Sequence, residues 1–402
     1  MYNIRKLTDD LTWIGVSDRK IAKFEKVYKL NSGMNYNSYF LDDGATVLFD
    51  TVDREVADTF FDNLEHCLNG RDLDYIVIHH MEPDHSATLA TVLDLYKSAK
   101  IILNAKTLQF LSQFFPGKDY SERAVVVKDG DEMELGNHTF KFVFAPMVHW
   151  PEVMMSFDET EGTLFSADAF GSYGAINGSI FADGKDFDTD LKNEARRYYT
   201  NIVGKYGMQT TGAINKLAAY DIKMICPLHS YVWRKDLDKI IGCYKTWGSY
   251  TPEEKGVFIL VGSIYGHTAN AAEVLMTELD KRGIDSVILD ASAADISDII
   301  AMAFKYSHIA IASATYNNGI YSPVEHAVKE LAAHGIAGRS FSVIENGTWA
   351  PSAAKNIFAI IEGLKNCKVT GETVTVKSAG NDGTMQSIEA LADAIKEDIG
   401  NI

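Results

Sequence analysis

The sequence predicts an α/β protein of two domains, residues 1–250 and 251–402. Three observations predict this organisation. The chain has 402 residues, which is more than one hydrophobic core usually serves. From residue 257 onward, five apolar strand patterns alternate with five helical patterns, as is typical of a doubly wound parallel sheet. Before residue 250, several strand patterns end in side chains that can bind a metal ion.

The composition excludes several classes of protein. The net charge of −17 argues against a nucleic-acid partner, because phosphate binding needs a basic surface. The chain contains no run of about 18 apolar residues, so we expect no membrane span, and its beginning lacks the apolar segment of a signal peptide. The cysteines are scattered without a CxxC pair, which fits free thiols and a cytoplasmic location: Cys67, Cys226, Cys243 and Cys367.

The first 250 residues predict a mixed layer structure of strands and helices, with a hairpin turn at Gly44. Strands are expected at residues 11–16, 38–41, 46–51, 75–78, 100–103, 124–127, 139–145, 162–167 and 222–226, and helices at 56–67, 86–96, 107–115, 190–202, 208–219 and 233–247.

The densest cluster of possible ligands follows the apolar strand at residues 75–78. His80, Glu82 and Asp84 occupy alternate positions, and alternate side chains of an extended chain point to the same side. Pro83 is expected to keep this segment out of a helix, because it fixes φ and lacks an N–H group. His85 follows directly. Metal binding is the simplest reason for two imidazoles and two carboxylates at one strand end.

Three further strand patterns lead to His149, Asp168 and His229. Taken singly, each is better explained as a polar residue in a loop than as a metal ligand, but their repetition at strand ends reverses this preference and favours one shared site. Seven ligands are too many for one ion with an open position, and they suit two ions that share a carboxylate. Four imidazoles with three carboxylates favour iron, manganese or zinc. The predicted set is His80, Glu82, Asp84, His85, His149, Asp168 and His229.

This ligand order resembles the HxHxDH pattern of the metallo-β-lactamase-like fold, with Glu82 in place of the second histidine. Together with a flavodoxin-like second half, the chain resembles the flavodiiron proteins over essentially its whole length. The resemblance implies a metallo-β-lactamase-like αββα sandwich over residues 1–250, followed by a flavodoxin-like doubly wound parallel sheet over 251–402.

The resemblance also implies a role for each ligand. Asp168 would bridge two iron ions, of which one would be held by His80, Glu82 and His149 and the other by Asp84, His85 and His229. A carboxylate in place of an imidazole stabilises the higher oxidation state, so Glu82 suits iron in oxygen chemistry better than zinc in hydrolysis. The pattern gives His79 no ligand role.

The second half follows the polar, proline-containing segment 250–255. Strands are expected at residues 257–262, 286–290, 308–312, 340–344 and 368–374, and helices at 268–282, 295–305, 322–335, 352–364 and 385–399. The loop after the first strand resembles the flavodoxin phosphate loop, in which hydroxyls and a helix N-terminus form an anion cradle.

The loops after the third and fourth strands flank the switch point of a sheet of order 2-1-3-4-5, where FMN binds. We therefore expect FMN contacts from three loops: Ser263, Ile264, Tyr265, Gly266, His267 and Thr268; Ser313, Thr315, Tyr316, Asn317, Asn318 and Gly319; and Asn346, Gly347, Thr348 and Trp349.

The resemblance implies a homodimeric oxidoreductase that reduces O2 to water, NO to N2O, or both, with two Fe and FMN as cofactors. Its donor would be a separate small redox protein such as rubredoxin, and the two subunits would lie head to tail, with Met147, Trp150, Pro151 and Trp349 as interface candidates. The alternative is a binuclear metallohydrolase with a flavodoxin-like binding module. A pure electron carrier would leave the metal ligands without a purpose.

Overall fold

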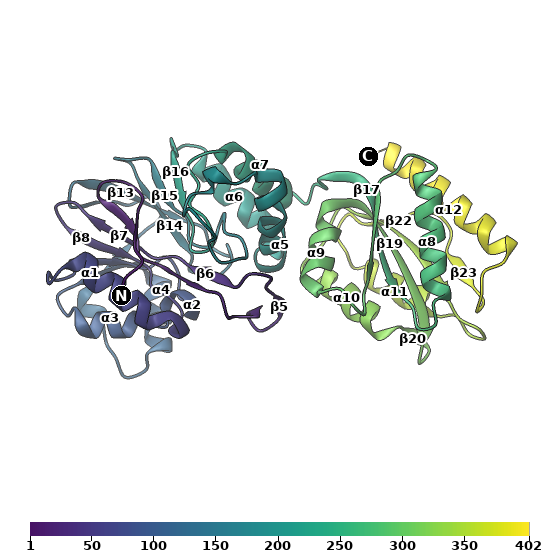
Figure 1. Ribbon diagram of the computed structural model, residues 1–402, viewed down its shortest axis with the longest axis horizontal. Coiled ribbons are helices and arrows are strands. Elements are labelled where there is room, and N and C mark those ends of the chain that lie inside the picture. Colours follow the sequence, from purple (N-terminus) through teal and green to yellow (C-terminus); the bar gives the residue numbers. More distant parts are fainter. Residues whose placement is uncertain (402) are drawn as a thin grey trace. The chain divides into compact units, whose positions relative to one another are not determined.

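The structure, a computed structural model, describes residues 1–401. The chain forms two compact units (Figure 1). The first contains Met1–Tyr199 and Met208–Lys245, and the second contains Thr200–Gly207 together with the chain from Thr246 onward. The predicted domain boundary between residues 250 and 251 stays a prediction. Among the helices of residues 1–401, none has the length and hydropathy that crossing a bilayer requires.

The elements before residue 250 are sixteen strands and seven α-helices. The strands are β1 (Arg5–Lys6), β2 (Leu11–Trp13), β3 (Val16–Asp18), β4 (Lys23–Phe24), β5 (Tyr28–Lys29), β6 (Met34–Tyr36), β7 (Tyr39–Asp42), β8 (Thr46–Phe49), β9 (Tyr75–Val77), β10 (Lys100–Asn104), β11 (Ala124–Val127), β12 (Glu132–Leu135), β13 (His138–Phe144), β14 (Met154–Asp158), β15 (Thr163–Phe165) and β16 (Met224–Cys226). The helices are α1 (Ala57–Leu68), α2 (Pro83–Ser86), α3 (Leu89–Leu95), α4 (Ala105–Phe114), α5 (Lys192–Ile202), α6 (Gly207–Leu217) and α7 (Leu237–Gly248).

Two sheets form the sandwich that the sequence predicts. One has the order β1-β2-β7-β8-β9-β10-β11 and the other the order β12-β13-β14-β15-β16. Apolar side chains of both sheets meet in one buried core, which includes Phe49 and Val77 from the first sheet and Phe140 and Phe165 from the second. Figure 1 shows α1, α3 and α4 on one side of the sandwich and α6 and α7 on the other. The predicted αββα architecture is confirmed.

Local sequence signals explain several of these elements. Gly44 turns β7 into β8 with φ 72°, a backbone conformation that glycine adopts without strain. Asn104 caps α4 because its side chain accepts hydrogen bonds from the backbone N–H groups of Lys106 and Thr107. Asn69 ends α1 in the left-handed region, with φ 48°.

Some predicted elements of this half need correction. The single strand expected at 11–16 is two strands, because the chain leaves the first sheet after β2 and pairs β3 with β6. Gly15 permits this departure, since a Cβ there would lie 2.3 Å from the carbonyl oxygen of Tyr36. The strands β12 and β14 were not predicted. Glu132 and Glu134 in β12 are exposed, which weakens its apolar pattern, and β14 is buried throughout and lacks alternation.

The second unit contains the predicted doubly wound sheet. Its strands are β17 (Glu254–Gly262), β18 (Ser286–Asp290), β19 (Tyr306–Tyr316), β20 (Gly319–Ile320), β21 (Ser340–Asn346), β22 (Lys368–Val369) and β23 (Val374–Val376), and its helices are α8 (His267–Asp280), α9 (Ile296–Lys305), α10 (Ser322–Ala333), α11 (Ala353–Ile361) and α12 (Asp382–Gly400). The parallel order β18-β17-β19-β21-β22 is the predicted order 2-1-3-4-5.

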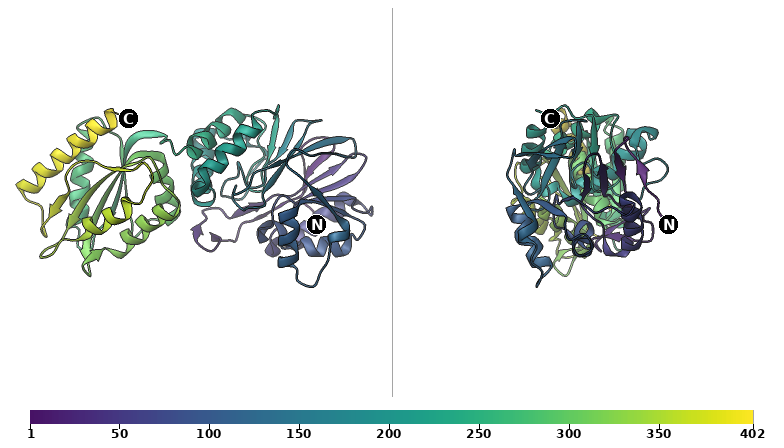
Figure 2. Two further views of the ribbon diagram at one scale, coloured as in Figure 1. Left: turned by 180° about the vertical axis from the view of Figure 1, so that it is seen from behind. Right: turned by 90° about the vertical axis from the view of Figure 1, so that its left-hand side faces the viewer.

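Each face of this sheet has its own core. Residues of α8 and α12 pack on one face, and residues of α9, α10 and α11 pack on the other (Figure 2). The strand predicted at 368–374 is interrupted between β22 and β23, because Gly371 has φ 74° and breaks the extended chain. The ends of β17, β19 and β21 lie side by side through their pairing, so the loops that follow them meet at one edge.

Candidate functional site

The ligand cluster begins where β9 leaves the centre of the first sheet. Pro83 does not keep this segment out of a helix, contrary to the prediction, because it occupies the first position of α2. A proline is tolerated there, since the first N–H groups of a helix have no partner within it. His80 and Glu82 therefore lie between β9 and α2, whereas Asp84 and His85 lie on the helical turn of α2. Because the helical turn begins at Pro83, the side chains of Asp84 and His85 point in a different direction from that of Glu82.

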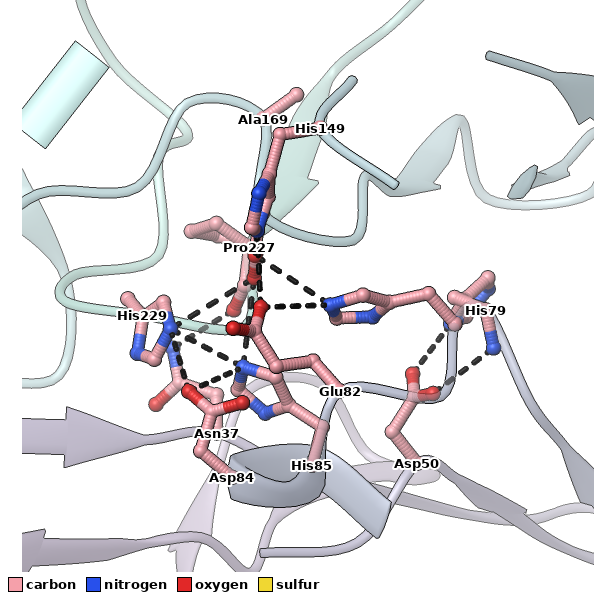
Figure 3. Close-up of polar contacts among 12 residues, drawn as sticks. Asn37, Asp50, His79, Glu82, Asp84, His85, His149, Ala169, Pro227 and His229 are labelled. Carbon is pink, nitrogen blue, oxygen red and sulfur yellow. Dashed lines mark hydrogen bonds and ion pairs between the residues drawn. The ribbon is translucent and has the colours of Figure 1, made fainter. Parts of the chain in front are cut away.

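The first ligand group contains His80, Glu82, His149 and Asp168, each with one ligand atom within 4.8 Å of the others. Nε2 of His149 lies 2.9 Å from Oε2 of Glu82 and 3.0 Å from Oδ2 of Asp168. Nε2 of His80 lies 3.4 Å from the same Asp168 oxygen. Figure 3 shows His149 and Glu82 converging from separate segments.

The second group contains Asp84, His85 and His229. Oδ2 of Asp84 lies 3.3 Å from Nε2 of each histidine, and the two Nε2 atoms lie 3.0 Å apart (Figure 3). Oδ1 of Asp168 lies 3.3 Å from Nε2 of His85 and 3.7 Å from Nε2 of His229. Asp168 thus presents one oxygen to each group.

Backbone carbonyls orient the His229 ring and its loop. Nδ1 of His229 lies 2.8 Å from the carbonyl oxygen of Asn35, to which it donates as the neutral tautomer, and this leaves Nε2 facing the other ligands. The Asn37 amide donates to the carbonyl oxygens of Pro227 and Ser230 at 2.7 and 2.9 Å. The strand-end loop after β16 is therefore held by Asn37, which lies between β6 and β7 (Figure 3).

Several buried ligand atoms lack a hydrogen-bond partner among residues 1–401, including Nε2 of His80, both oxygens of Asp84 and Oδ1 of Asp168. Buried polar atoms are normally paired, so such a set calls for another ligand. Burial lowers the pKa of His80, but the charges and hydrogen bonds of Asp168 and Glu82 together outweigh it, and the pKa is raised well above its usual value. A bound metal ion would displace the proton that the His80 imidazole otherwise retains. The donor set therefore fits metal ions.

His79 belongs to a separate hydrogen-bond network, in keeping with the sequence pattern, which gives it no ligand role. Its Nδ1 pairs with the Asp50 carboxylate and its Nε2 lies 2.8 Å from Oγ of Ser156, all three side chains being buried. The Asp50 carboxylate also accepts from the His79 backbone N–H at 2.8 Å. This network lies away from the ligand atoms (Figure 3) and anchors the chain just before His80.

The spacing did not point to the aromatic residues around His229. Phe24 meets its ring edge-on at 5.3 Å between centroids, and Tyr36 and Tyr198 lie at 5.8 and 5.5 Å. The buried hydroxyl of Tyr198 has no hydrogen-bond partner among residues 1–401. These residues come from distant segments, so no local pattern could have linked them to the site.

The second candidate site is a cavity of about 750 Å3 at the edge where β17, β19 and β21 end, a size typical of small-molecule sites. Gly266, with φ 95°, starts α8, and Oγ of Ser263 accepts its N–H at 3.1 Å. Most predicted flavin residues line this cavity, whereas Gly266, Ser313 and Gly319 are outside its lining. Ala314, Ala350 and Ser378 line it and were not predicted. Ser378 follows β23, so the expectation that loops after parallel strands form the site could also have identified it.

Comparison with known proteins extends these observations. Residues 34–230 match the family model described as ODP family beta lactamase. The anaerobic nitric oxide reductase flavorubredoxin of Aliivibrio fischeri is 28% identical, over 87% of this chain and 71% of that protein. The structure of rubredoxin oxygen:oxidoreductase from Desulfovibrio gigas superposes with a TM-score of 0.94 and 25% identity, covering 99% of both chains. Over essentially its whole length, the chain is similar to the flavodiiron proteins. The flavodiiron protein of Giardia intestinalis has the same fold, with a TM-score of 0.91 and 24% identity, over 99% of this chain and 97% of that one.

The chain is an oxidoreductase, like the nitric oxide reductase and the oxygen oxidoreductase to which it is similar. The predicted combination of a metallo-β-lactamase-like sandwich and a flavodoxin-like sheet is confirmed. The family resemblance, first suggested by the order of seven ligands and the fusion to a flavodoxin-like half, is confirmed as well.

Proposed function

We propose that this flavodiiron protein reduces O2 to water, NO to N2O, or both, at a di-iron centre that receives electrons through FMN. The observation that carries the proposal is the carboxylate of Asp168, which faces two separate ligand groups with its two oxygens. A shared carboxylate suits two ions held close together. The gas reductases named in the comparisons support the reaction class.

The two iron ions would share Asp168. His80, Glu82 and His149 would complete one site, and Asp84, His85 and His229 the other; the histidine nitrogens lie between 2.9 and 3.7 Å from their carboxylate partners. Distances of this size separate neighbouring ligands around one metal ion with bonds of about 2.0–2.2 Å. Mixed imidazole and carboxylate ligands suit iron. When bound, iron supplies coordination and electrons for the gas.

FMN would occupy the 750 Å3 cavity of the second unit. Its phosphate fits at the N-terminus of α8, where Ser263 and Thr268 offer hydroxyls beside unpaired backbone N–H groups. Tyr265 and Trp349 support a place for the ring. Their side chains line the cavity yet are 91% and 88% exposed, which is unusual for large aromatic residues unless a ligand or partner covers them.

The electron donor would be a separate small redox protein of the rubredoxin class. The extents of the two domains are proposed as residues 1–250 for the di-iron domain and 251–402 for the FMN domain. We also propose a cytoplasmic homodimer in which the subunits lie head to tail, so that the flavin of one subunit serves the irons of the other. A two-fold dimer would provide two such pairs by symmetry.

Anaerobic turnover with a chemically reduced rubredoxin tests the proposal. The protein should contain two iron ions and one FMN per chain, and the donor should be oxidised when O2 or NO is added. Water or N2O should accumulate in proportion to the electrons consumed. An active protein with two zinc ions, no iron and no flavin absorbance would overturn the proposal in favour of the hydrolase alternative.

A further inference from the structure

We propose that His138, Asp10 and Asp43 bind a third metal ion, a divalent cation such as Zn²⁺, which ties together the two sheets of the first unit. Each of these residues offers a ligand atom, and the three atoms lie within 4.8 Å of one another. None belongs to the seven residues proposed to hold the iron ions. The inference is independent of the gas that the enzyme reduces.

The distances fit the edges of a metal coordination shell. Nε2 of His138 lies 3.0 Å from Oδ2 of Asp10 and 3.5 Å from Oδ2 of Asp43. A tetrahedral zinc ion with bonds of about 2.0–2.1 Å separates its ligand atoms by roughly 3.3–3.4 Å. The corresponding nitrogen–oxygen distances in the proposed di-iron centre cover the same range, as the 2.9 Å between His149 and Glu82 illustrates.

Neighbouring groups hold these ligand atoms in place. Nδ1 of His138 lies 2.8 Å from Oδ2 of Asp158, which fixes the orientation of the ring, and Nε2 forms a hydrogen bond of 3.0 Å with Oδ2 of Asp10 that a bound metal ion would replace. Oδ1 of Asp43 accepts from the amide of Asn137 at 2.8 Å, and Oδ1 of Asp10 accepts from the hydroxyl of Thr8. Each carboxylate thus directs its other oxygen toward the imidazole. Metal-binding histidines are commonly oriented by a carboxylate in this way.

The charge balance also favours a cation. Three carboxylates surround one imidazole, and within residues 1–401 the ion pairs of Asp10, Asp43 and Asp158 involve His138 alone. With three carboxylates and a protonated imidazole, the cluster has a net charge of about −2. With a neutral imidazole and a bound divalent cation, the net charge falls to about −1. His138 and Asp158 are buried at 3% and 4% exposure, whereas the side chains of Asp10 and Asp43 are 25% and 38% exposed, so a cation could reach the cluster from solvent.

The place of the cluster indicates a structural ion. Asp43 precedes β8, which runs parallel to β9, and β9 leads to His80 at its other end. Asp158 precedes β15, whose other end leads to Asp168. The cluster therefore lies at the end of the sandwich opposite the proposed iron ligands. Asp10 and Asp43 come from turns of the first sheet, and His138 and Asp158 from strands of the second, so the ion would link the sheets.

Metal analysis of the holoprotein tests this site. Zn²⁺ is titrated into protein that already holds iron and FMN, and iron and zinc are counted by mass spectrometry after desalting. Wild type should take up one zinc ion per chain without losing iron, and its melting temperature should rise. The Asp43→Asn variant should bind zinc at least about tenfold more weakly and lose the thermal shift. Asp43 is 38% exposed in a turn, so the variant should fold and keep its iron.

Asp9→Asn provides the matched control, because it removes the same charge from an exposed position next to Asp10. It should bind zinc like wild type. X-ray absorption at the zinc edge of the wild-type protein should show nitrogen and oxygen ligands, including one imidazole. This measurement tests the site without any substitution. The proposal fails if wild type takes up no additional zinc, if zinc enters only as iron leaves, or if Asp43→Asn binds zinc as tightly as wild type.

Discussion

Oδ1 of Asp168 lies 3.3 Å from Nε2 of His85, while the second oxygen of the same carboxylate faces the other ligand group. One side chain thus spans both halves of the proposed di-iron centre. Any change at Asp168 should therefore affect both metal ions, whereas a change at a terminal ligand should affect mainly one.

Asp168→Ala should lose both iron ions and all gas reduction while retaining FMN. Without the carboxylate, two close cations repel each other with no shared negative charge, and this repulsion is strong in a buried site. Iron analysis and flavin absorbance of the purified variant check the prediction. His149→Ala is the control, because it removes a ligand of one ion only and should leave more iron bound. Equal iron loss in the two variants would contradict the bridging role.

Ser263→Ala combined with Thr268→Ala should release FMN and leave the iron content unchanged. Hydrogen bonds to a charged phosphate contribute about 1.5–3 kcal/mol each, so affinity should fall by roughly two to four orders of magnitude. Fluorescence titration of the apoprotein with FMN measures the change.

Thr277→Ala is the matched control for this double variant. Thr277 also lies on α8, but its hydroxyl donates to the carbonyl oxygen of Glu273 and does not line the cavity. Its FMN affinity should equal that of wild type. Tight flavin binding in the double variant would mean that the phosphate is held elsewhere.

Subunit exchange should restore activity between two inactive variants if the proposed head-to-tail dimer carries the electrons. One variant is Asp168→Ala, and the other is the Ser263→Ala, Thr268→Ala pair. A mixed dimer contains one intact flavin and one intact iron centre on different chains. Oxygen consumption should rise after mixing toward half the wild-type rate per mixed dimer.

Exchange itself has to be followed separately, by native mass spectrometry of isotopically labelled subunits. Each variant incubated alone is the control and should stay inactive. If mixed dimers form and no activity returns, electron transfer takes place within a single chain, and the interface assigned to Met147, Trp150, Pro151 and Trp349 loses its main argument.

The buried His308 should make the free energy of unfolding depend on pH. Burial lowers its pKa, although the Asp398 carboxylate partly opposes this. The unfolded chain therefore binds a proton first as the pH falls, and the stability from this group is present above the unfolded pKa of about 6.5 and lost below it. Urea unfolding between about pH 7.5 and 5 should show falling stability. His308→Gln, which keeps a polar group near Ser342, should show a shallower slope.

Carboxylates also bind protons over the acid part of this pH range and change the free energy of unfolding, so a second histidine variant is needed as a control. His326→Gln serves this purpose, because His326 is 64% exposed on α10. Its slope should match that of wild type. Identical slopes for wild type and His308→Gln would show that His308 carries no part of the pH dependence.

The sequence by itself determined most of the succession of strands and helices, because apolar periodicity is a local property that burial then satisfies, but it missed β12 and β14, in which that periodicity is weak or absent. It also determined that ligand-type side chains follow β9, β15 and β16, since residues at strand ends are read directly from the chain. The strand order of the second unit followed from the alternation of strand and helix and from the rules of parallel sheets.

Only the tertiary structure decided how the ligands divide. Pro83 begins α2 instead of preventing it, and the helical turn directs Asp84 and His85 away from Glu82. The position of Asp168 between the two groups depends on the pairing of β15 with β16, which joins residues about sixty positions apart. The cluster around His138 likewise arises from four separate turns and strands. Spacing along a chain describes neighbours in sequence, whereas a metal site is made by neighbours in space.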